Sequence, residues 1–164
     1  MIKIRTAEPA DLPKLLDIYN YEVKNGVATF DTEPWTLEER GRWMAEHNVA
    51  NHPLVVAEIG DEVAGYASLS AFNSKGAFAS TVELSVYVDA GYRGEGVGRA
   101  LTEAVIRLAR EDCRTHRVVS VITDGNEASI ALHEKLGFRR TGEITEAGIK
   151  FGRYLSVIYF ELAV

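Results

Sequence analysis

The segment from Thr81 to Ala109 constrains the fold more than any other part of the chain. Residues 81–88 read Thr-Val-Glu-Leu-Ser-Val-Tyr-Val, a run rich in β-branched and aromatic residues that is typical of a strand. Residues 91–98 hold four of the 14 glycines. Apolar residues then recur at helical spacing from Val97 to Ala109. A strand, a glycine-rich loop and a long helix in this order predict a crossover to a parallel neighbouring strand.

The glycine-rich loop is also a candidate binding site. Glycine permits positive φ, so successive backbone N–H groups can converge on an anion, and the start of the next helix adds partial positive charge. Arg93 lies in the loop, and a pyrophosphate is the natural ligand. Two nucleotide-binding motifs do not fit. A P-loop would have Lys-Ser/Thr after Gly98, but this chain has Arg99-Ala100. A dinucleotide-binding loop that begins Gly94-x-Gly96 would have its third glycine at position 99, which is arginine here. A glycine-rich turn without a ligand is the alternative.

Periodicity and turn residues predict the remaining elements. Strands are expected at residues 2–5, 54–59, 63–72, 117–123, 138–144 and 154–162. Helices are expected after Pro9, from the Thr36 cap to about His47, and over residues 126–136 with Gly137 at the C′ position. Residues 22–35 are expected to form a loop or broken helix, and residues 73–80 a mobile loop. The order predicts one α/β (α+β) domain over residues 1–164, with a mixed, mostly antiparallel sheet flanked by helices.

Composition excludes several classes of protein. A chain of 164 residues with 46% hydrophobic side chains suits one globular domain. The net charge of −6 argues against general attraction to nucleic acid or anionic lipid. The single Cys113 forbids an internal disulfide, and the histidines have no metal-ligand spacing, so no metal is expected. No apolar run approaches the ~20 residues of a membrane span, and the N-terminus does not resemble a signal peptide, so a cytoplasmic protein is expected.

Two blocks of residues carry a family resemblance. The first is Arg93-x-x-Gly96-x-Gly98 after a strand, and the second is Asn126-x-x-Ser129-x-x-Leu132-His133-x-x-Leu136-Gly137-Phe138. Together they resemble the GCN5-related N-acetyltransferases (GNAT). Within that superfamily the chain looks most like the phosphinothricin and methionine sulfoximine acetyltransferases, through segments such as residues 28–34, 81–83 and 150–155. The resemblance implies a single GNAT domain, often a homodimer, that transfers acetyl from acetyl-CoA to the primary amine of a small molecule by direct attack.

The resemblance also implies which residues bind acetyl-CoA. The strand that leads into the loop would hold the pantetheine arm, the loop would hold the pyrophosphate, and the start of the second block would add hydrogen bonds. The residues concerned are Val86, Tyr87, Val88, Arg93, Gly94, Glu95, Gly96, Val97, Gly98, Asn126 and Ser129.

Glu83 and His133 are the candidate catalytic residues. The attacking amine must lose a proton, and an acidic residue in the middle of a strand is otherwise disfavoured, so Glu83 is the candidate base. Its alternative is a solvent-facing glutamate. His133 stands where many superfamily members have a tyrosine that protonates the thiolate, and it would serve as acid, orienter or cofactor contact unless it is structural. Cys113 is expected to be structural, and His47, His52 and His116 to be surface residues.

The chain departs from the subgroup at two positions that concern the acceptor. Leu84 follows the strand glutamate in place of the usual histidine, and Ala79 follows Phe78 in place of arginine. The missing arginine would suit a substrate carboxylate. The candidates for the acceptor site are Phe30, Phe78, Lys75 and Arg153, with Lys150, Trp35 and Tyr154 as further options. Alternatives for the function are transfer to a polyamine, an antibiotic or a protein N-terminus, a non-catalytic acyl-CoA sensor, and, remotely, a nucleotide phosphotransferase.

Overall fold

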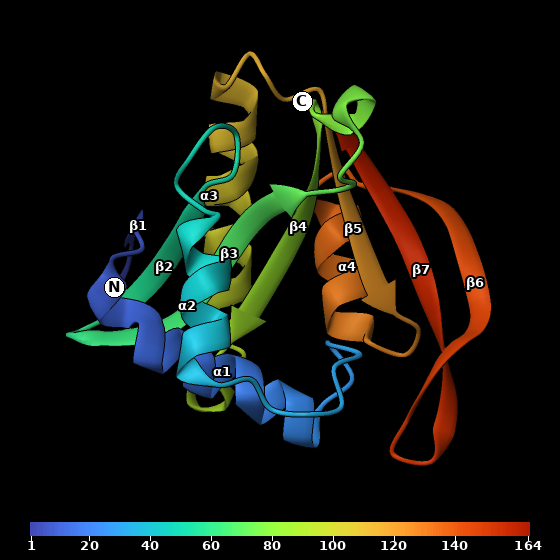
Figure 1. Cartoon of the computed structure of the whole chain (residues 1–164), viewed down its shortest axis with the longest axis horizontal. Coiled ribbons are helices and arrows are strands. Elements are labelled where there is room, and N and C mark those ends of the chain that lie inside the picture. The colour runs from blue at the N-terminus through green and yellow to red at the C-terminus, as the bar shows by residue number, and fades with distance from the viewer.

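The computed structural model describes residues 1–164 and contains one seven-stranded sheet with the order β1-β2-β3-β4-β5-β7-β6 (Figure 1). The strands are β1 Ile2–Thr6, β2 Leu54–Ile59, β3 Glu62–Ala71, β4 Thr81–Val88, β5 Arg117–Thr123, β6 Arg139–Lys150 and β7 Arg153–Ala163. The helices are α1 Leu12–Asn25, α2 Leu37–Ala45, α3 Val97–Glu111 and α4 Glu127–Lys135. Only β4 and β5 pair in parallel, on either side of the α3 crossover. The prediction of a mixed, mostly antiparallel sheet flanked by helices is therefore confirmed.

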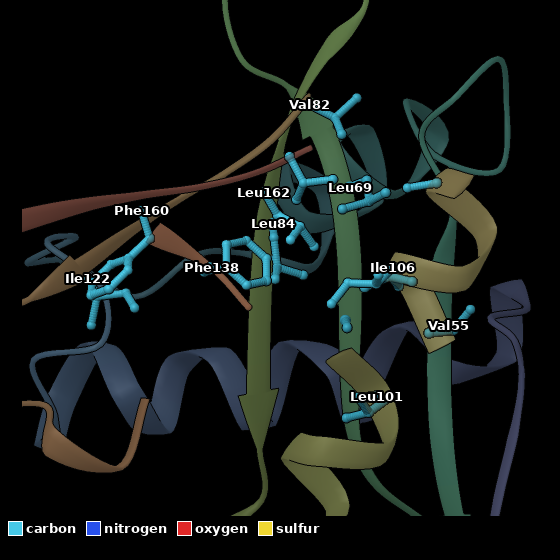
Figure 2. Packing of buried hydrophobic residues seen from close by; sticks show 14 of the residues in the cluster. Val55, Leu69, Val82, Leu84, Leu101, Ile106, Ile122, Phe138, Phe160 and Leu162 are labelled. Carbon is cyan, nitrogen blue, oxygen red and sulfur yellow. The ribbon is translucent and has the colours of Figure 1, made fainter. Parts of the chain in front are cut away.

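The period-two alternation of the strands divides the core between the two faces of the sheet. On β2, Val55 packs with the α3 residues Leu101 and Val105, whereas Leu54 packs with Leu15 of α1. Figure 2 shows the α3 side, where Leu101 and Ile106 face Val55 and Leu69. Helices α1 and α2 thus cover the opposite face from α3 (Figure 1).

Strands β4 and β5 separate part-way along their length. Their pairing runs only from Thr81↔Arg117 to Glu83↔Val119, although β4 stays paired with β3 as far as Val88. Figure 1 shows the two strands diverging toward their C-terminal ends. The edge of β4 beyond Glu83 consequently faces an opening in the middle of the sheet.

Two predicted element boundaries need correction. Helix α1 continues through Asn25, and the Gly26 N–H caps it by donating to the Glu22 carbonyl at 2.9 Å. Strand β6 continues to Lys150, six residues past the predicted end, because this edge strand is exposed along most of its length and has no apolar alternation to mark it. Residues 73–80 form a loop, as predicted, and it includes one 3₁₀ turn, Gly76–Phe78.

The predicted capping positions are confirmed. Thr36 accepts a hydrogen bond from the Glu39 N–H at 3.2 Å, and the Thr36 N–H donates to Glu39 Oε2 at 2.7 Å. Gly137 ends α4 with φ of +89°. No helix in the chain is both long and apolar enough to cross a membrane.

Candidate functional site

The glycine-rich loop has the geometry of an anion site. Gly94 and Gly96 have φ of +81° and +85°, which other residues rarely adopt, and Gly96 is the N-cap of α3. A Cβ added at either position would project into open space. The first turn of α3 has backbone N–H groups without intrahelical partners, and they face outward with the positive end of the helix dipole. The residues present therefore fit a pyrophosphate.

One cavity adjoins this loop, and a second cavity meets the first at β4. The loop cavity, of about 540 Å³, is lined by Tyr92, Arg93, Gly94, Gly96, Val97 and Gly98 among others. The cleft cavity, of about 640 Å³, fills the opening between β4 and β5 and includes Glu83, Ser120 and His133. Both cavities share the lining residues Ala28, Val86, Tyr87, Asn126 and Ser129. A long ligand in the loop cavity can therefore extend along β4 into the cleft cavity.

Glu83 lies at the point where the two strands part. It is the last β4 residue that pairs with β5, and its half-buried side chain lines the cleft cavity. Burial raises the pKa of the Glu83 carboxyl above its ordinary value. A carboxylate with a raised pKa is a stronger base, so this position suits removal of a proton from an ammonium group.

His133 is an interior residue of α4, only 2% exposed. Its Nδ1 is 2.7 Å from the Ser129 carbonyl oxygen, and its Nε2 is 3.0 Å from Ser120 Oγ. A carbonyl can only accept, so Nδ1 carries the proton, and burial lowers the pKa of the imidazole. The neutral ring therefore accepts at Nε2 and has no proton there to give to a thiolate. Of the three roles expected for His133, this argues against the acid and leaves the orienter and the cofactor contact.

Asn126 connects the cavities through the start of α4. Its side-chain oxygen accepts from the Ser129 N–H at 3.3 Å and caps the helix. Both residues line both cavities, so the second sequence block lies beside the junction of the loop cavity and the cleft cavity.

An unexpected carboxylate lies in the loop cavity. The Arg93 guanidinium forms an ion pair with Glu22 of α1, whose carboxyl group is largely buried. The same carboxylate occupies the space over Gly26, where a Cβ would lie 1.9 Å from Glu22 Oε2. The sequence predicted a loop or broken helix from residue 22 and did not reveal this ion pair, because nothing local to Glu22 marks a partner 71 positions away.

The structure brings only one of the four predicted acceptor residues to the cleft cavity. Phe30 lines it, with its ring against the backbone of Gly148. Lys75, Phe78 and Arg153 line neither cavity. The sequence alone could not show that these three residues lie away from the cavities. Residues 75–78 precede β4, at the end of the strand where β4 and β5 are still paired. Arg153 follows the exposed turn between β6 and β7.

Lys150 is not free to pair with a substrate carboxylate. Its side chain is buried, and Nζ donates to the Thr29 carbonyl at 2.8 Å and to the Glu22 carbonyl at 3.3 Å. Lys150 thereby ties the β6–β7 hairpin to the loop that covers the cleft cavity. Of the other options, Tyr154 is exposed and Trp35 donates to Asp31 at 2.7 Å, and neither lines the loop cavity or the cleft cavity.

A buried aromatic cluster lies behind the cleft cavity. Arg40 is 2% exposed, and its guanidinium lies 3.5 Å from the Trp43 ring centroid and 4.4 Å from that of Tyr19. It donates to the Tyr66 hydroxyl at 2.5 Å, and the Tyr66 ring packs against Tyr87. Tyr19 and Tyr87 line the cleft cavity, so the cluster supports its wall.

His47 also belongs to this buried side of the molecule. The prediction that it is a surface residue was wrong: the ring is 5% exposed, and both nitrogens are hydrogen-bonded. It packs against Trp43 with ring centroids 4.4 Å apart. His52 is half-buried and His116 is exposed.

Comparison with known proteins decides the family. The model of the acetyltransferase (GNAT) family matches residues 15–138. The chain belongs to the GNAT acetyltransferase family. This GNAT enzyme is 41% identical over 164 residues to phosphinothricin N-acetyltransferase of Streptomyces coelicolor, covering 98% of this chain and 95% of that protein. It is 41% identical over 160 residues to L-methionine sulfoximine/L-methionine sulfone acetyltransferase of Pseudomonas aeruginosa, covering 97% and 92%.

A solved GNAT structure relates the fold to the cofactor. The structure of an acetyltransferase from Salmonella typhimurium with its cofactor acetyl-CoA matches with a TM-score of 0.95 and 36% identity, covering 99% of this chain and 94% of that one. The GNAT enzyme described here is therefore an acetyl-CoA-dependent N-acetyltransferase, close to the phosphinothricin and methionine sulfoximine acetyltransferases. The resemblance stated from the sequence is confirmed.

Proposed function

We propose that this GNAT enzyme acetylates the primary amine of a small amino-acid analogue, such as phosphinothricin or methionine sulfoximine, by direct attack in a ternary complex. The observation that carries the proposal is the junction of the two cavities at β4, with Glu83 at its inner end. A donor that extends from the loop cavity and an acceptor in the cleft cavity would meet beside this carboxylate. The curated relatives named for these two acceptors support the substrate class.

The cofactor would be held mostly by backbone groups. The loop residues from Arg93 to Gly98 would surround the pyrophosphate, and Asn126 and Ser129 would contact the arm beyond it. Residues 84–88 have no strand partner on the β5 side, so Val86, Tyr87 and Val88 can pair with an extended pantetheine as an added strand would. The bound cofactor supplies the acetyl thioester.

Three protein groups would then promote transfer. Glu83 takes the proton of the acceptor ammonium, directly or through one water molecule. The free amine then bonds to the thioester carbon, the carbon–sulfur bond breaks, and CoA leaves as a thiol with the proton that the nitrogen loses. A backbone N–H of residues 84–88 polarises the thioester carbonyl and stabilises the developing oxyanion. His133 orients the site by holding Ser120 of β5 and the Ser129 carbonyl of α4 together. We expect no metal in this reaction.

A homodimer is part of this proposal. Four large apolar side chains, Ile144, Ile149, Phe151 and Tyr154, are exposed on the β6–β7 hairpin. Apolar side chains gathered on one projecting hairpin are typical of a contact surface. Sedimentation equilibrium should give twice the mass of the chain, and the double variant Ile149→Ser/Phe151→Ser should sediment as a monomer.

A thiol-release assay over a panel of amines tests the acceptor. The panel contains phosphinothricin, methionine sulfoximine, a polyamine, an aminoglycoside and a peptide with a free N-terminus. We expect the highest kcat/KM with the first two. A preference for the polyamine, aminoglycoside or peptide would replace the proposed substrate class, and binding of acetyl-CoA without CoA release from any amine would contradict the reaction itself.

A further inference from the structure

A buried histidine lies behind the strand that pairs with the Glu83 strand. His47 follows α2, and its Nε2 is 2.8 Å from Ser70 Oγ of β3. Its Nδ1 is 2.8 Å from the Trp43 carbonyl oxygen. Neither His47 nor Ser70 lines the loop cavity or the cleft cavity, and the reaction proposed above uses neither of them.

The direction of the His47–Ser70 hydrogen bond follows from its surroundings. A carbonyl oxygen only accepts, so the proton of the neutral ring is on Nδ1. Burial lowers the pKa of His47, so the ring stays neutral near neutral pH and Nε2 has a free lone pair. The Ser70 hydroxyl therefore donates its only proton to His47.

Ser70 is also the cross-strand neighbour of Glu83. The two residues are directly opposite in the antiparallel β3–β4 register. Opposite residues point to the same face of the sheet, with Cβ atoms ~4.5–5.5 Å apart. With its proton directed to His47, the Ser70 hydroxyl has only lone pairs left to present to the Glu83 side chain, which leaves the same face of the sheet. A protonated carboxyl can donate to such an oxygen, whereas a carboxylate is repelled by it.

No other group on this side of the sheet reverses that effect. The charged and titratable side chains on this face include Tyr19 of α1, Arg40 of α2, Tyr66 of β3, Tyr87 of β4, Arg117 of β5, Tyr159 and Glu161 of β7, and Asp31 of the loop after α1; Glu46 and His52 lie near His47. Glu161 is paired with Arg139 of β6 at 2.5 Å. Arg40 donates to Tyr66, and Asp31 accepts from Tyr19 and Trp35. Glu83 forms no ion pair with any of them, so the orientation of its neutral neighbour Ser70 can add to the effect of burial.

We propose that His47 is a positioning residue for the catalytic base, because it holds the Ser70 proton away from Glu83 and so favours the protonated carboxyl. The inference rests on the proposed role of Glu83. If His47 is removed, the Ser70 hydroxyl can rotate and donate to Glu83, which stabilises the carboxylate and makes it a weaker base.

Matched variants separate this role from simple packing. His47→Asn keeps an amide near the Trp43 carbonyl but leaves no atom within reach of Ser70, whereas His47→Gln places an amide near the position of Nε2. Ser70→Ala removes the hydroxyl itself. Nuclear magnetic resonance of protein labelled with carbon-13 at the glutamate carboxyls measures the Glu83 titration without relying on activity. The resonance that disappears in Glu83→Gln identifies Glu83.

The proposal predicts a specific pattern of titrations. His47→Asn should move the Glu83 midpoint down by roughly 0.5–1 pH unit and lower kcat a few-fold without changing the acceptor KM. His47→Gln should restore the midpoint. The double variant His47→Asn/Ser70→Ala should titrate like Ser70→Ala, because the effect of His47 passes through Ser70. An unmoved midpoint in His47→Asn, or an equal shift with and without Ser70, would overturn the proposal.

The same set of variants tells the two proposals apart. If Glu83→Gln keeps the wild-type kcat, the assignment of Glu83 as base is wrong whatever the titration shows. A general base contributes about 10²–10⁴-fold to the rate, so Glu83→Gln is expected to lose at least 100-fold in kcat. If it does, while His47→Asn leaves the Glu83 titration midpoint in place, only the role of His47 is wrong.

Discussion

The Arg93 guanidinium of the glycine-rich loop is paired with the Glu22 carboxylate of α1, inside the cavity that suits the pyrophosphate. Glu22 is largely buried and Arg93 is half exposed, so the pair is anchored on the α1 side. A pyrophosphate that approaches this loop meets a cation already neutralised by a fixed carboxylate. The pair thus opposes binding of an anionic ligand and also holds α1 against the loop.

Glu22→Gln should therefore tighten acetyl-CoA binding. The substitution keeps the shape of the side chain, frees Arg93 and removes one negative charge from the cavity. We expect a gain of about 1 kcal/mol, or roughly fivefold in Kd, that is largest at low salt. Calorimetric titration at two salt concentrations measures it. Glu38→Gln is the control, since it makes the same charge change in an exposed ion pair with Arg42. Weaker binding in Glu22→Gln would instead show that Glu22 orients Arg93 for the ligand.

Gly148→Ala should impair the acceptor but not the cofactor. A Cβ at Gly148 would lie 2.6 Å from Phe30 Cδ2, so the Phe30 ring must move within the wall of the cleft cavity. We expect the acceptor KM to rise roughly tenfold. Acetyl-CoA affinity should not change, because Phe30 does not line the loop cavity.

Gly142→Ala is the matched control for that experiment. It lies on the same strand, and a Cβ there would meet nothing within 4 Å. Steady-state kinetics with the best amine of the panel gives both values. Equal acceptor KM values for the two variants would mean that the contact between Phe30 and Gly148 does not shape the acceptor site.

Local signals in the sequence were enough to predict the elements around the site. The pattern of residues 81–109 predicted strand, loop and helix, and the Thr36–Glu39 spacing predicted the start of α2. These features depend on residues within a few positions of one another, where periodicity and capping act. The same local reasoning led to Glu83, because a charged residue is unusual inside a strand.

The parts that sequence reasoning missed depend on contacts between distant segments. Lys150 donates to a carbonyl 121 positions away, and Glu22 pairs with Arg93 across 71 positions. His47 was predicted on the surface because an isolated histidine near the end of a helix has no pattern that reveals burial. Only the packing of α2 on β3 places it beside Ser70. Such contacts follow from the tertiary fold and have no signature in spacing.

Glu83→Gln should stabilise the fold while it removes the base. Burial raises the pKa of Glu83, so the folded state prefers the protonated carboxyl. In the unfolded chain this carboxyl has its ordinary pKa, near 4.5. Glu83 therefore costs stability as the pH rises from 4.5 through the higher pKa of the folded state. Glutamine has no such cost. At pH 7 the melting temperature should rise by about 2–4 °C for each kcal/mol relieved. A lower melting temperature in Glu83→Gln at pH 7 than in wild type would contradict the burial cost.

His133 and His47 should make the protein sensitive to mild acid. Burial lowers the pKa of both rings, so the folded state keeps them neutral below the pH at which the unfolded chain takes up protons, near 6.5. The unfolded state then binds more protons, and the free energy of unfolding falls as the pH drops through this value. Each histidine can contribute a slope of up to about 1.4 kcal/mol per pH unit. Urea unfolding between pH 7.5 and 5.5 measures the slope.

His133→Gln separates the contribution of one ring. Its amide lies near the position of Nε2, where His133 meets Ser120, but it cannot titrate. We expect this variant to lose less stability between pH 7.5 and 5.5 than the wild type does, even if it is less stable at pH 7.5. His116→Gln is the control, because His116 is exposed. The same acid slope in His133→Gln and in the wild type would mean that His133 titrates in the folded protein as it does in the unfolded chain.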